Sequence, residues 1–490
     1  MEKTIDDHEP ESSPERSDRH SWTVKEEDAA RRKVDTTVLP LLFLGLLVFQ
    51  LDRMNLASAL TAGFATDIGV DQATINLGNQ LMFLFIVVFE IPCNMLLQKI
   101  GPRKWISGQV VSFGLVATLQ VLVRDRTGFL IARSFLGLAE SAYIPGAVYT
   151  LSTWYRQKEL AKRVALFFFG MFSGNALSPI LASGIIQLDG RQGLSGWQWI
   201  FLIEGIFTIS VGLSLLFILP GSPESPTPLL SRGLIRISPA DQHILQQRLL
   251  TDGDQEETRS QGLHIPWSLV RKTLLHYKRW PHYLSTSVVF STWSPLTTYT
   301  PSIYLSLGFS RVAANALATV AAAATLPVVF FFAWLSDRTG ARGASVIAAQ
   351  ACYLVALIVA RAVQDTSGGG GGGVWRRWAV WTVVNAFAVG YHPVHNTWVQ
   401  LNCEGPRERS IAIAMWVMFA IGGLMYGSQY FQGDDRPFYR SGLRTMIVLV
   451  ASGIVLALAQ ELVYWIHNKK VKIGTARIID GEDKPRVYVL

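Results

Sequence analysis

Residues 37–60 read TVLPLLFLGLLVFQLDRMNLASAL, an apolar run that holds only two charged residues, Asp52 and Arg53. A helix of about 20 apolar residues crosses the hydrocarbon core of a bilayer, because each residue adds about 1.5 Å of rise. This run is therefore long enough to span a membrane, and its two charges fall within the predicted span.

Eleven further apolar runs of similar length follow along the 490 residues, and together they decide the fold class. Unpaired backbone groups cannot face lipid, and no ten-residue alternation indicates a β-barrel, so each run is predicted to be a helix. The sequence therefore predicts an all-α membrane protein with twelve transmembrane helices. The predicted spans are 37–60, 78–98, 105–123, 128–152, 163–186, 197–219, 282–306, 311–335, 343–363, 376–400, 410–431 and 443–466.

The composition agrees with this fold class and argues against several functions. Only 16% of the residues are charged, whereas a soluble domain carries about 25%. The net charge is +8, but the basic residues are scattered, so no nucleic-acid partner is expected. Cys93, Cys352 and Cys403 lie far apart and have no metal-binding or disulfide spacing. No phosphate-binding loop or nucleophile elbow occurs either, so we predict no enzymatic activity, no metal and no cofactor.

A polar stretch between the sixth and seventh spans divides the chain into two sets of six, the layout of a duplicated transporter. Within it, an amphipathic helix is predicted over Pro239–Leu250 with Ser238 as its N-cap. Gly368–Gly373 is predicted to be a flexible connector. Most Lys and Arg residues fall on the side of the tails, so both termini are predicted to be cytoplasmic. The predicted parts are a tail (1–36), a six-helix half (37–219), a cytoplasmic loop (220–281), a second half (282–466) and a tail (467–490).

Two short loops at equivalent places in the two halves carry similar motifs. The loop after the second span reads NMLLQKIGPRK (94–104), and the loop after the eighth reads AWLSDRTGAR (333–342). Both resemble the inner loop of the major facilitator superfamily, G-x-L-x-D-R-x-G-R-R, although the first copy has Asn94 and Gln98 in place of Gly and Asp. The resemblance implies a tight glycine turn and charges that latch neighbouring helices. The implied gating residues are Arg103, Lys104, Asp337, Arg338, Gly340 and Arg342.

Further motifs narrow this resemblance, which runs from about Val38 to Trp465. The runs LDRMN (51–55), EIPCN (90–94) and RSFLGLAE (133–140) resemble the anion:cation symporter group. The runs YIPG (143–146), WY (154–155), ELAKR (159–163) and WIFLIEG (199–205) resemble its fungal branch, the allantoate permease family. Proteins of that family are proton-driven carriers of small organic anions such as allantoate, nicotinate, pantothenate and biotin. The resemblance implies a monomeric proton symporter in the plasma membrane, with the vacuolar membrane as an alternative.

Charged residues inside the spans are functional candidates in any membrane protein, because a charge in lipid is costly. Arg133 and Glu140 are two helical turns apart and share a face, whereas the adjacent Asp52 and Arg53 point about 100° apart. The resemblance implies that Arg53 holds the substrate carboxylate and that Asp52 and Glu140 carry protons. It also implies that Arg133 pairs with Glu140 until Glu140 is protonated. The alternative is that these charges only lock helices together.

The remaining polar residues of the spans receive weaker assignments. Glu90 and Glu204 are predicted to be structural and to pair with loop arginines. His392 and Asn396 share a helix face in the tenth span, and His395 lies next to Asn396. A hydrogen-bonded core histidine is expected here, and a histidine that titrates near neutral pH is the alternative. Trp293 and Thr300 are further candidates for the pocket wall. The predicted substrate-binding set is Arg53, Asn55, Arg133, Tyr299, His392 and Asn396.

Two alternative functions stay open. The first is an exporter of a secondary metabolite by proton antiport, because Gly170, Gly174, Pro179 and Gly184 in the fifth span partly resemble an antiporter motif. Small residues at these positions are expected instead to let helices pack closely. The second is a non-transporting nutrient receptor, which the shortness of both tails disfavours.

Overall fold

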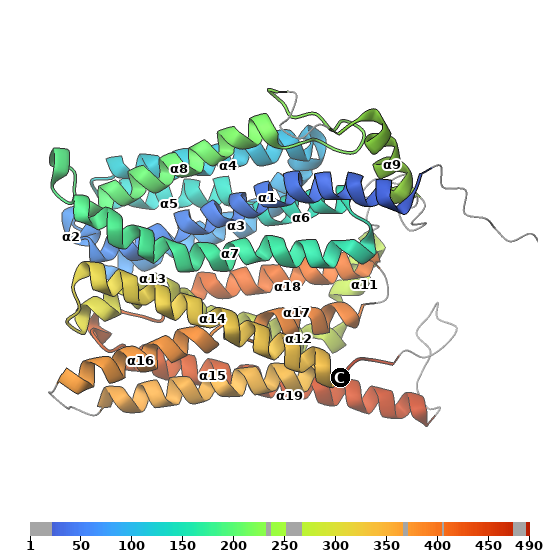
Figure 1. The fold of residues 1–490 in the computed structure, drawn as a ribbon. Helices are drawn as coiled ribbons and strands as arrows, with labels where there is room; N and C mark the ends of the chain where they lie inside the picture. The colour runs from blue at the N-terminus through green and yellow to red at the C-terminus, as the bar shows by residue number, and fades with distance from the viewer. Residues whose placement is uncertain (1–21, 232–236, 251–266, 366–370, 404–405, 474–486) are drawn as a thin grey trace, which may run out of the picture.

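The structure is a computed structural model that describes residues 22–231, 237–250, 267–365, 371–403, 406–473 and 487–490. Over these residues the chain forms a bundle of roughly parallel and antiparallel helices in two groups, which lie one above the other in Figure 1. The first group is α1 (Val24–Thr61), α2 (Phe64–Asp67), α3 (Gln72–Ile100), α4 (Pro102–Leu119), α5 (Arg126–Glu140), α6 (Tyr143–Trp154), α7 (Gln157–Ile185) and α8 (Gly196–Ile218). The second is α12 (Trp280–Ser291), α13 (Trp293–Ser306), α14 (Arg311–Thr339), α15 (Arg342–Asp365), α16 (Gly371–Phe387), α17 (His392–Leu401), α18 (Pro406–Gly427) and α19 (Arg440–Lys472).

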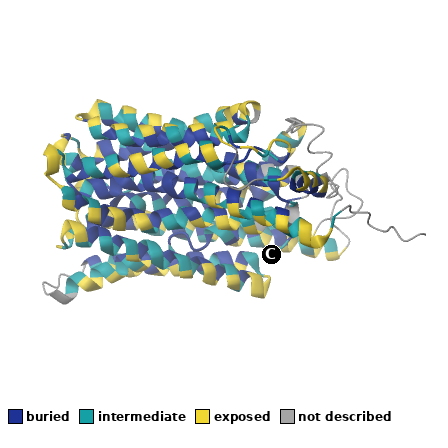
Figure 2. Cartoon of the chain, turned by 45° about the horizontal axis from the view of Figure 1, so that its top comes forward, coloured by how far each residue is buried: buried dark blue, intermediate teal, exposed yellow. Residues whose placement is uncertain are grey.

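The predicted fold class is confirmed. Eight of the described helices are long and apolar enough to cross a membrane, and α18 contains a shorter apolar stretch, Ile411–Gly427. The pairs α5–α6, α12–α13 and α16–α17 supply one span each, which completes the twelve. Buried residues gather inside the bundle and exposed ones cover its outside, as Figure 2 shows. Exposed side chains such as Phe330 and Val455 are apolar, as expected for a surface that faces lipid.

Three spans that were predicted as continuous helices, 128–152, 282–306 and 376–400, are each interrupted near the middle. The fourth span breaks at Ala142, whose φ of 64° lies in the left-handed region. Pro145, Pro295 and Pro393 lie in the first turn of the segment that follows each break. A proline is tolerated there because the amide hydrogen that it lacks has no helical acceptor in the first turn.

The two groups of helices meet along three pairs, α1 with α13, α7 with α14 and α3 with α18. Helix α9 (Pro239–Leu250), the amphipathic helix predicted from sequence, packs on α1. Ser238 caps it by accepting a hydrogen bond from the Asp241 amide at 3.1 Å, as predicted. Lys33 ties α9 to α1 through an ion pair with Asp241 at 2.5 Å. We call this end of the bundle the α9 end and the opposite one the α2 end (Figure 1).

Two connections in the second group also take defined positions. Gly371–Gly373 form the first turn of α16, so the prediction of a flexible connector fails there, and 368–370 lie outside the described residues. The segment 487–490 docks at the α9 end. The Tyr488 ring stacks on Tyr464 with centroids 4.4 Å apart, and the Trp398 indole donates to the Val489 carbonyl at 2.8 Å.

Candidate functional site

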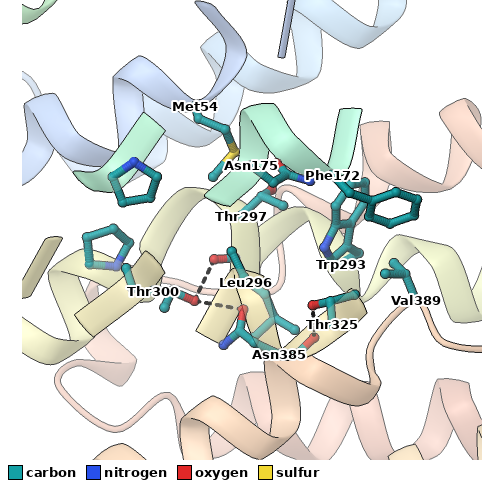
Figure 3. A pocket seen from close by; sticks show the side chains of 14 residues that line it. Met54, Phe172, Asn175, Trp293, Leu296, Thr297, Thr300, Thr325, Asn385 and Val389 are labelled. Atoms are coloured by element: carbon teal, nitrogen blue, oxygen red, sulfur yellow. Dashed lines mark hydrogen bonds between the residues drawn. The ribbon is translucent and has the colours of Figure 1, made fainter. Parts of the chain in front are cut away.

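A pocket with about 510 Å³ of space outside the atoms lies between the two halves (Figure 3). Helices α1 and α7 form one wall, and α13, α14 and α16 form most of the other. Its lining residues are Met54, Phe172, Asn175, Pro179, Trp293, Leu296, Thr297, Thr300, Pro301, Ala318, Ala322, Thr325, Asn385 and Val389. The wall therefore combines apolar and aromatic surface with hydroxyl and amide groups, and it carries no charged side chain among the described residues.

The polar groups of the pocket are held in place by their neighbours. The Thr300 hydroxyl donates to the Leu296 carbonyl at 2.7 Å and to Asn385 Oδ1 at 3.1 Å. The Thr325 hydroxyl donates to the Asn385 carbonyl at 3.4 Å (Figure 3). On the opposite wall, Gln50 of α1 donates to Asn175 Oδ1 at 2.7 Å and fixes that amide. The polar wall is thus pre-organised, which lowers the entropic cost of binding a solute.

Arg53 lies one residue before the pocket-lining Met54 and is the best placed of the predicted substrate anchors. Its Nε donates to Glu140 Oε2 at 2.6 Å, and its guanidinium carbon lies 4.3 Å from the Phe49 ring centroid. The two Nη atoms donate to no other described residue, and the side chain is 17% exposed. Half of the guanidinium fork is therefore held by Glu140, while the other half remains available to an anion.

Arg133 does not pair with Glu140 as predicted. It is 1% exposed, and its Nη2 donates to Asn79 Oδ1 at 2.5 Å. Its Nε and Nη1 have no hydrogen-bond partner among the described residues. Glu140 feels the charge of Arg133 but bonds to Arg53 instead. The two arginines consequently flank one carboxylate, and the geometry assigns the direct contact to the arginine of α1.

Asp52 lies on a different face of α1, against α8, and is fully buried. Its Oδ1 accepts a hydrogen bond from the Thr208 hydroxyl at 3.2 Å. Glu204, also on α8, is buried beside Asn55, whose amide nitrogen donates to Glu204 Oε2 and, at 2.8 Å, to the Leu51 carbonyl in the orientation that satisfies both amide atoms. The prediction that Glu204 pairs with a loop arginine is therefore wrong, and Asn55 serves this cluster rather than the pocket wall.

Glu90 forms no ion pair with any described residue, so its predicted pairing with a loop arginine is also not observed. Its carboxylate feels the charge of Arg53, and its Oε2 is buried without a hydrogen-bond partner. Glu90 thus adds a further acid to the surroundings of Arg53.

In the second half, none of the predicted binding set lines the pocket, whereas two of the further candidates for its wall do. Trp293 and Thr300 line it, whereas Tyr299 is buried and donates to Asn76 Oδ1 at 2.5 Å. His392 stacks on Phe290 with ring centroids 4.3 Å apart, outside the pocket lining. Asn396 accepts from Gln400 at 3.1 Å on its own helix.

His395 is a hydrogen-bonded histidine in the core of the second half, as the sequence analysis predicts for a histidine of the tenth span. Its Nε2 lies 3.0 Å from His282 Nδ1, and its Nδ1 lies 3.1 Å from the Thr286 hydroxyl. All three side chains are fully buried in the second half.

The inner-loop residues take the positions that the motif implies. Gly340 ends α14 with φ 69°, a left-handed conformation that glycine adopts without strain. Arg342, the first residue of α15, pairs with Asp337 at 2.5 Å, so the charges latch α14 to α15. Arg338 stacks over the Trp334 ring. In the first copy, Arg103 donates to the Thr227 carbonyl and Lys104 is exposed.

Polar contacts between the halves gather toward the α2 end. Asn76 donates to the Phe431 carbonyl at 2.8 Å, and Asn79 donates to the Thr298 hydroxyl at 3.1 Å. At the same end, Asn315 donates to the Thr61 hydroxyl at 2.8 Å. Among the described residues, no hydrogen bond or ion pair joins the two halves at the α9 end. The structure is therefore locked at the α2 end.

Sequence reasoning missed several pocket residues. Asn175 and Asn385 carried a usable signal, because amides are uncommon in apolar spans. Met54, Phe172, Thr297 and Thr325 carried none, since such residues are ordinary in any transmembrane helix.

Two helical halves that enclose a pocket between them, with buried charges beside it, define the class of secondary carriers with alternating access. The chain belongs to the Major Facilitator Superfamily, whose family model matches residues 42–428. It is 25% identical over 450 residues to an uncharacterized transporter of Saccharomyces cerevisiae, with 92% of this chain and 82% of the relative covered. It is 28% identical over 337 residues to a protein of Agrobacterium vitis named "Putative tartrate transporter", with 69% and 71% covered. A crystal structure of a D-xylose–proton symporter has the same fold, with a TM-score of 0.64, 15% identity, and 86% and 96% covered.

The fifth-span glycines set the distance between α1 and α7, and hence one pocket wall. A Cβ on Gly174 would lie 2.7 Å from the Leu47 carbonyl oxygen, whereas a Cβ on Gly184 meets nothing within 4 Å. These contacts agree with the close-packing reading of the Gly/Pro pattern.

Gly174→Ala is expected to lower the free energy of unfolding by about 1–3 kcal/mol, because the added methyl pushes α1 and α7 apart. Gly184→Ala is the matched control and should leave stability unchanged or raise it by up to about 1 kcal/mol, since alanine favours helix. Unfolding of the purified protein in detergent measures both. Equal effects of the two substitutions would contradict this account of the packing.

Proposed function

We propose that the protein is a proton-coupled symporter that carries a small organic anion inward, as members of the allantoate permease family do. The observation that supports this most directly is the half-occupied guanidinium of Arg53, which precedes the pocket-lining Met54 on α1. A guanidinium binds a carboxylate through two parallel hydrogen bonds, and it keeps its charge at any physiological pH. The relative named for tartrate, itself an organic anion, agrees with this substrate class.

Proton coupling follows from competition for Arg53. When Glu140 is ionised, it holds Arg53 Nε at 2.6 Å and neutralises its charge. A proton on Glu140 removes the negative charge, so the whole guanidinium becomes available to the substrate carboxylate. Proton and anion then bind together and cross as a neutral pair. Arg133 supports this exchange, because its positive charge stabilises whichever anion lies nearby, and Asp52 is the second proposed proton-carrying acid.

The pocket provides the remaining contacts with the solute. Trp293 and Phe172 offer aromatic surface, while Thr297 and Asn385 offer hydrogen-bonding groups. A small molecule with a carboxylate at one end and a flat or apolar body would match such a wall. Tyr299, His392 and Asn396 remain proposed only as residues that shape the second half, because the pocket lining does not include them.

We further propose that the α9 end faces the cytoplasm, with both termini on that side, in the plasma membrane or the vacuolar membrane. The distribution of Lys and Arg supports this orientation. The lock at the α2 end would then close the carrier toward the outside. The carrier would open outward if the hydrogen bonds at the α2 end broke while the inner-loop ion pairs, such as Asp337–Arg342, remained.

The proposed symport predicts proton entry into proteoliposomes when a panel of small carboxylates is added outside. Arg53→Ala should abolish this entry, because the fixed cation is lost, whereas Arg311→Ala, which removes an exposed arginine at the α2 end, should retain it. Glu140→Gln should abolish uphill accumulation but spare substrate exchange. A pH-sensitive dye in the lumen and a labelled substrate give the two readouts.

Three outcomes would contradict the proposal or a part of it. Carboxylates that move no protons in the wild-type protein would reduce the assignment to an unspecified carrier. Outward movement of substrate against inward proton flow would identify an exporter instead. Retained uphill uptake in Glu140→Gln would reject Glu140 as the coupling acid.

The α2-end lock predicts a change in outward opening. Asn76→Ala removes the hydrogen bonds to Phe431 and Tyr299, each worth about 0.6 kcal/mol within a membrane. The outward-open population should rise about eightfold. The measurement is the labelling rate of a cysteine at Thr297, in a background without native cysteines, by an impermeant thiol reagent outside the cell.

Arg311→Ala is the control, since it removes an exposed ion pair with Asp189 at the same end. An unchanged or slower labelling rate in Asn76→Ala would count against the lock or against the proposed orientation.

A further inference from the structure

The interface between α1 and α8 contains two carboxyl groups, those of Asp52 and Glu204. The proposed transport cycle uses only that of Asp52. Asp52 and Glu204 are 0% and 2% exposed. Among the described residues, no Lys, Arg or His forms an ion pair with either of them, while Asp52 feels the charges of Glu140 and Glu204. Asp52 Oδ2 and Glu204 Oε1 both lack a hydrogen-bond partner. Two buried acids therefore lie in one interface, and neither is ion-paired with a described cation.

Neutral polar groups connect the two acids into one cluster. The Thr208 hydroxyl lies within bonding distance of Asp52 Oδ1, at 3.2 Å, and of the Glu204 carbonyl, at 3.0 Å. Asn55, one turn after Asp52, donates to the Glu204 carboxyl in its satisfied orientation. One hydroxyl and one amide thus serve two carboxyl groups, which is too few donors to stabilise two full negative charges at this depth.

The other charged groups near this cluster do not supply the missing cation. Arg53 points about 100° away from Asp52 around α1 and is bound to Glu140 of α5, and Arg133 is bound to Asn79 of α3. Helix α4 carries its charges, Arg103 and Lys104, in its first turn at the α9 end, as α7 does in its first two turns. Glu204 is the only charged residue of α8.

The charge balance of the first half also indicates that its buried carboxyls are not all ionised. Four carboxyls inside the spans, those of Asp52, Glu90, Glu140 and Glu204, accompany two arginines, Arg53 and Arg133. The set is neutral when the four carboxyls together hold two protons. Glu140 is the least suited to hold one of them in this conformation, because it is the one that is ion-paired.

We propose that Asp52 and Glu204 form a carboxyl pair that shares one proton, a proton-binding site between α1 and α8 next to the Arg53–Glu140 ion pair. One carboxyl carries the proton as an acid, and its partner accepts from it. Two carboxyl groups at close range in a dry site cannot both ionise without strong repulsion, which favours such sharing. The presence of this proton does not depend on transport, whereas any role of the site in coupling rests on the proposed function.

The pair also stabilises the contact between α1 and α8 while it is protonated. A shared proton holds the two carboxyls together, whereas loss of the proton leaves two like charges that repel. Deprotonation would therefore loosen the contact of α8 with α1, the helix that carries Arg53. A second proton site linked in this way to the substrate anchor could set how many protons move with each anion.

Infrared spectroscopy of the purified protein in detergent tests the pair without any substrate. A protonated carboxyl has its own C=O stretching band, distinct from that of a carboxylate, and a buried one absorbs apart from exposed acids. We expect this band in the wild-type protein at neutral pH, where an isolated carboxyl is ionised. Both Glu204→Gln and Asp52→Asn should reduce it, because each removes one member of the pair.

Glu140→Gln is the matched control, since it removes a buried acid that is ion-paired and should leave the band in place. Thermal unfolding confirms that each variant is folded. The pair is overturned if the wild-type protein has no such band at neutral pH, a result that needs no variant. It is also overturned if folded Glu204→Gln and Asp52→Asn keep the full band, or if Glu140→Gln alone removes it. None of these results depends on whether the protein transports carboxylates.

Discussion

The ion pair between Arg53 and Glu140 is the interaction on which the rest of the first half depends. A guanidinium inside a membrane protein is tolerated only with a counter-ion, and α5 supplies it at 2.6 Å. This pair fixes α1 against α5 and leaves the outer half of the guanidinium free beside Met54. The same contact that stabilises the helix packing therefore leaves the two Nη atoms of Arg53 without a hydrogen-bond partner among the described residues.

The interruptions in three spans give the bundle its hollow centre. Each break sits where a proline begins the next segment, so the chain bends without losing a helical hydrogen bond. The break after Glu140 ends α5 at its functional acid, and the break at Thr292 places Trp293 on the pocket wall. Close glycine contacts, such as Gly174 against α1, then hold α1 and α7 together as one wall of the pocket.

Much of this architecture could be predicted from the sequence, because apolar runs of about 20 residues have few alternatives in lipid. The buried charges of α1 and α5 could also be found, since each is costly in an apolar run. Their partners could not. Whether Arg53 or Arg133 contacts Glu140 depends on the rotation of α1 relative to α5, which the hydrophobic pattern does not set. For the same reason Asn55 and Glu204 were assigned to separate roles, although they lie in contact. Pocket residues such as Thr325 gave no sequence signal, because a hydroxyl that bonds within its own half is ordinary in any span.

The central claim is that a proton on Glu140 releases Arg53 for the substrate. Carboxylate binding to the purified protein, measured by calorimetry across a range of pH, tests it most directly. The account predicts that wild-type affinity rises as the pH falls, because binding favours protonated Glu140. In Glu140→Gln the affinity should be high at every pH and independent of it. A variant whose affinity still rises with falling pH as steeply as that of the wild type would contradict the claim.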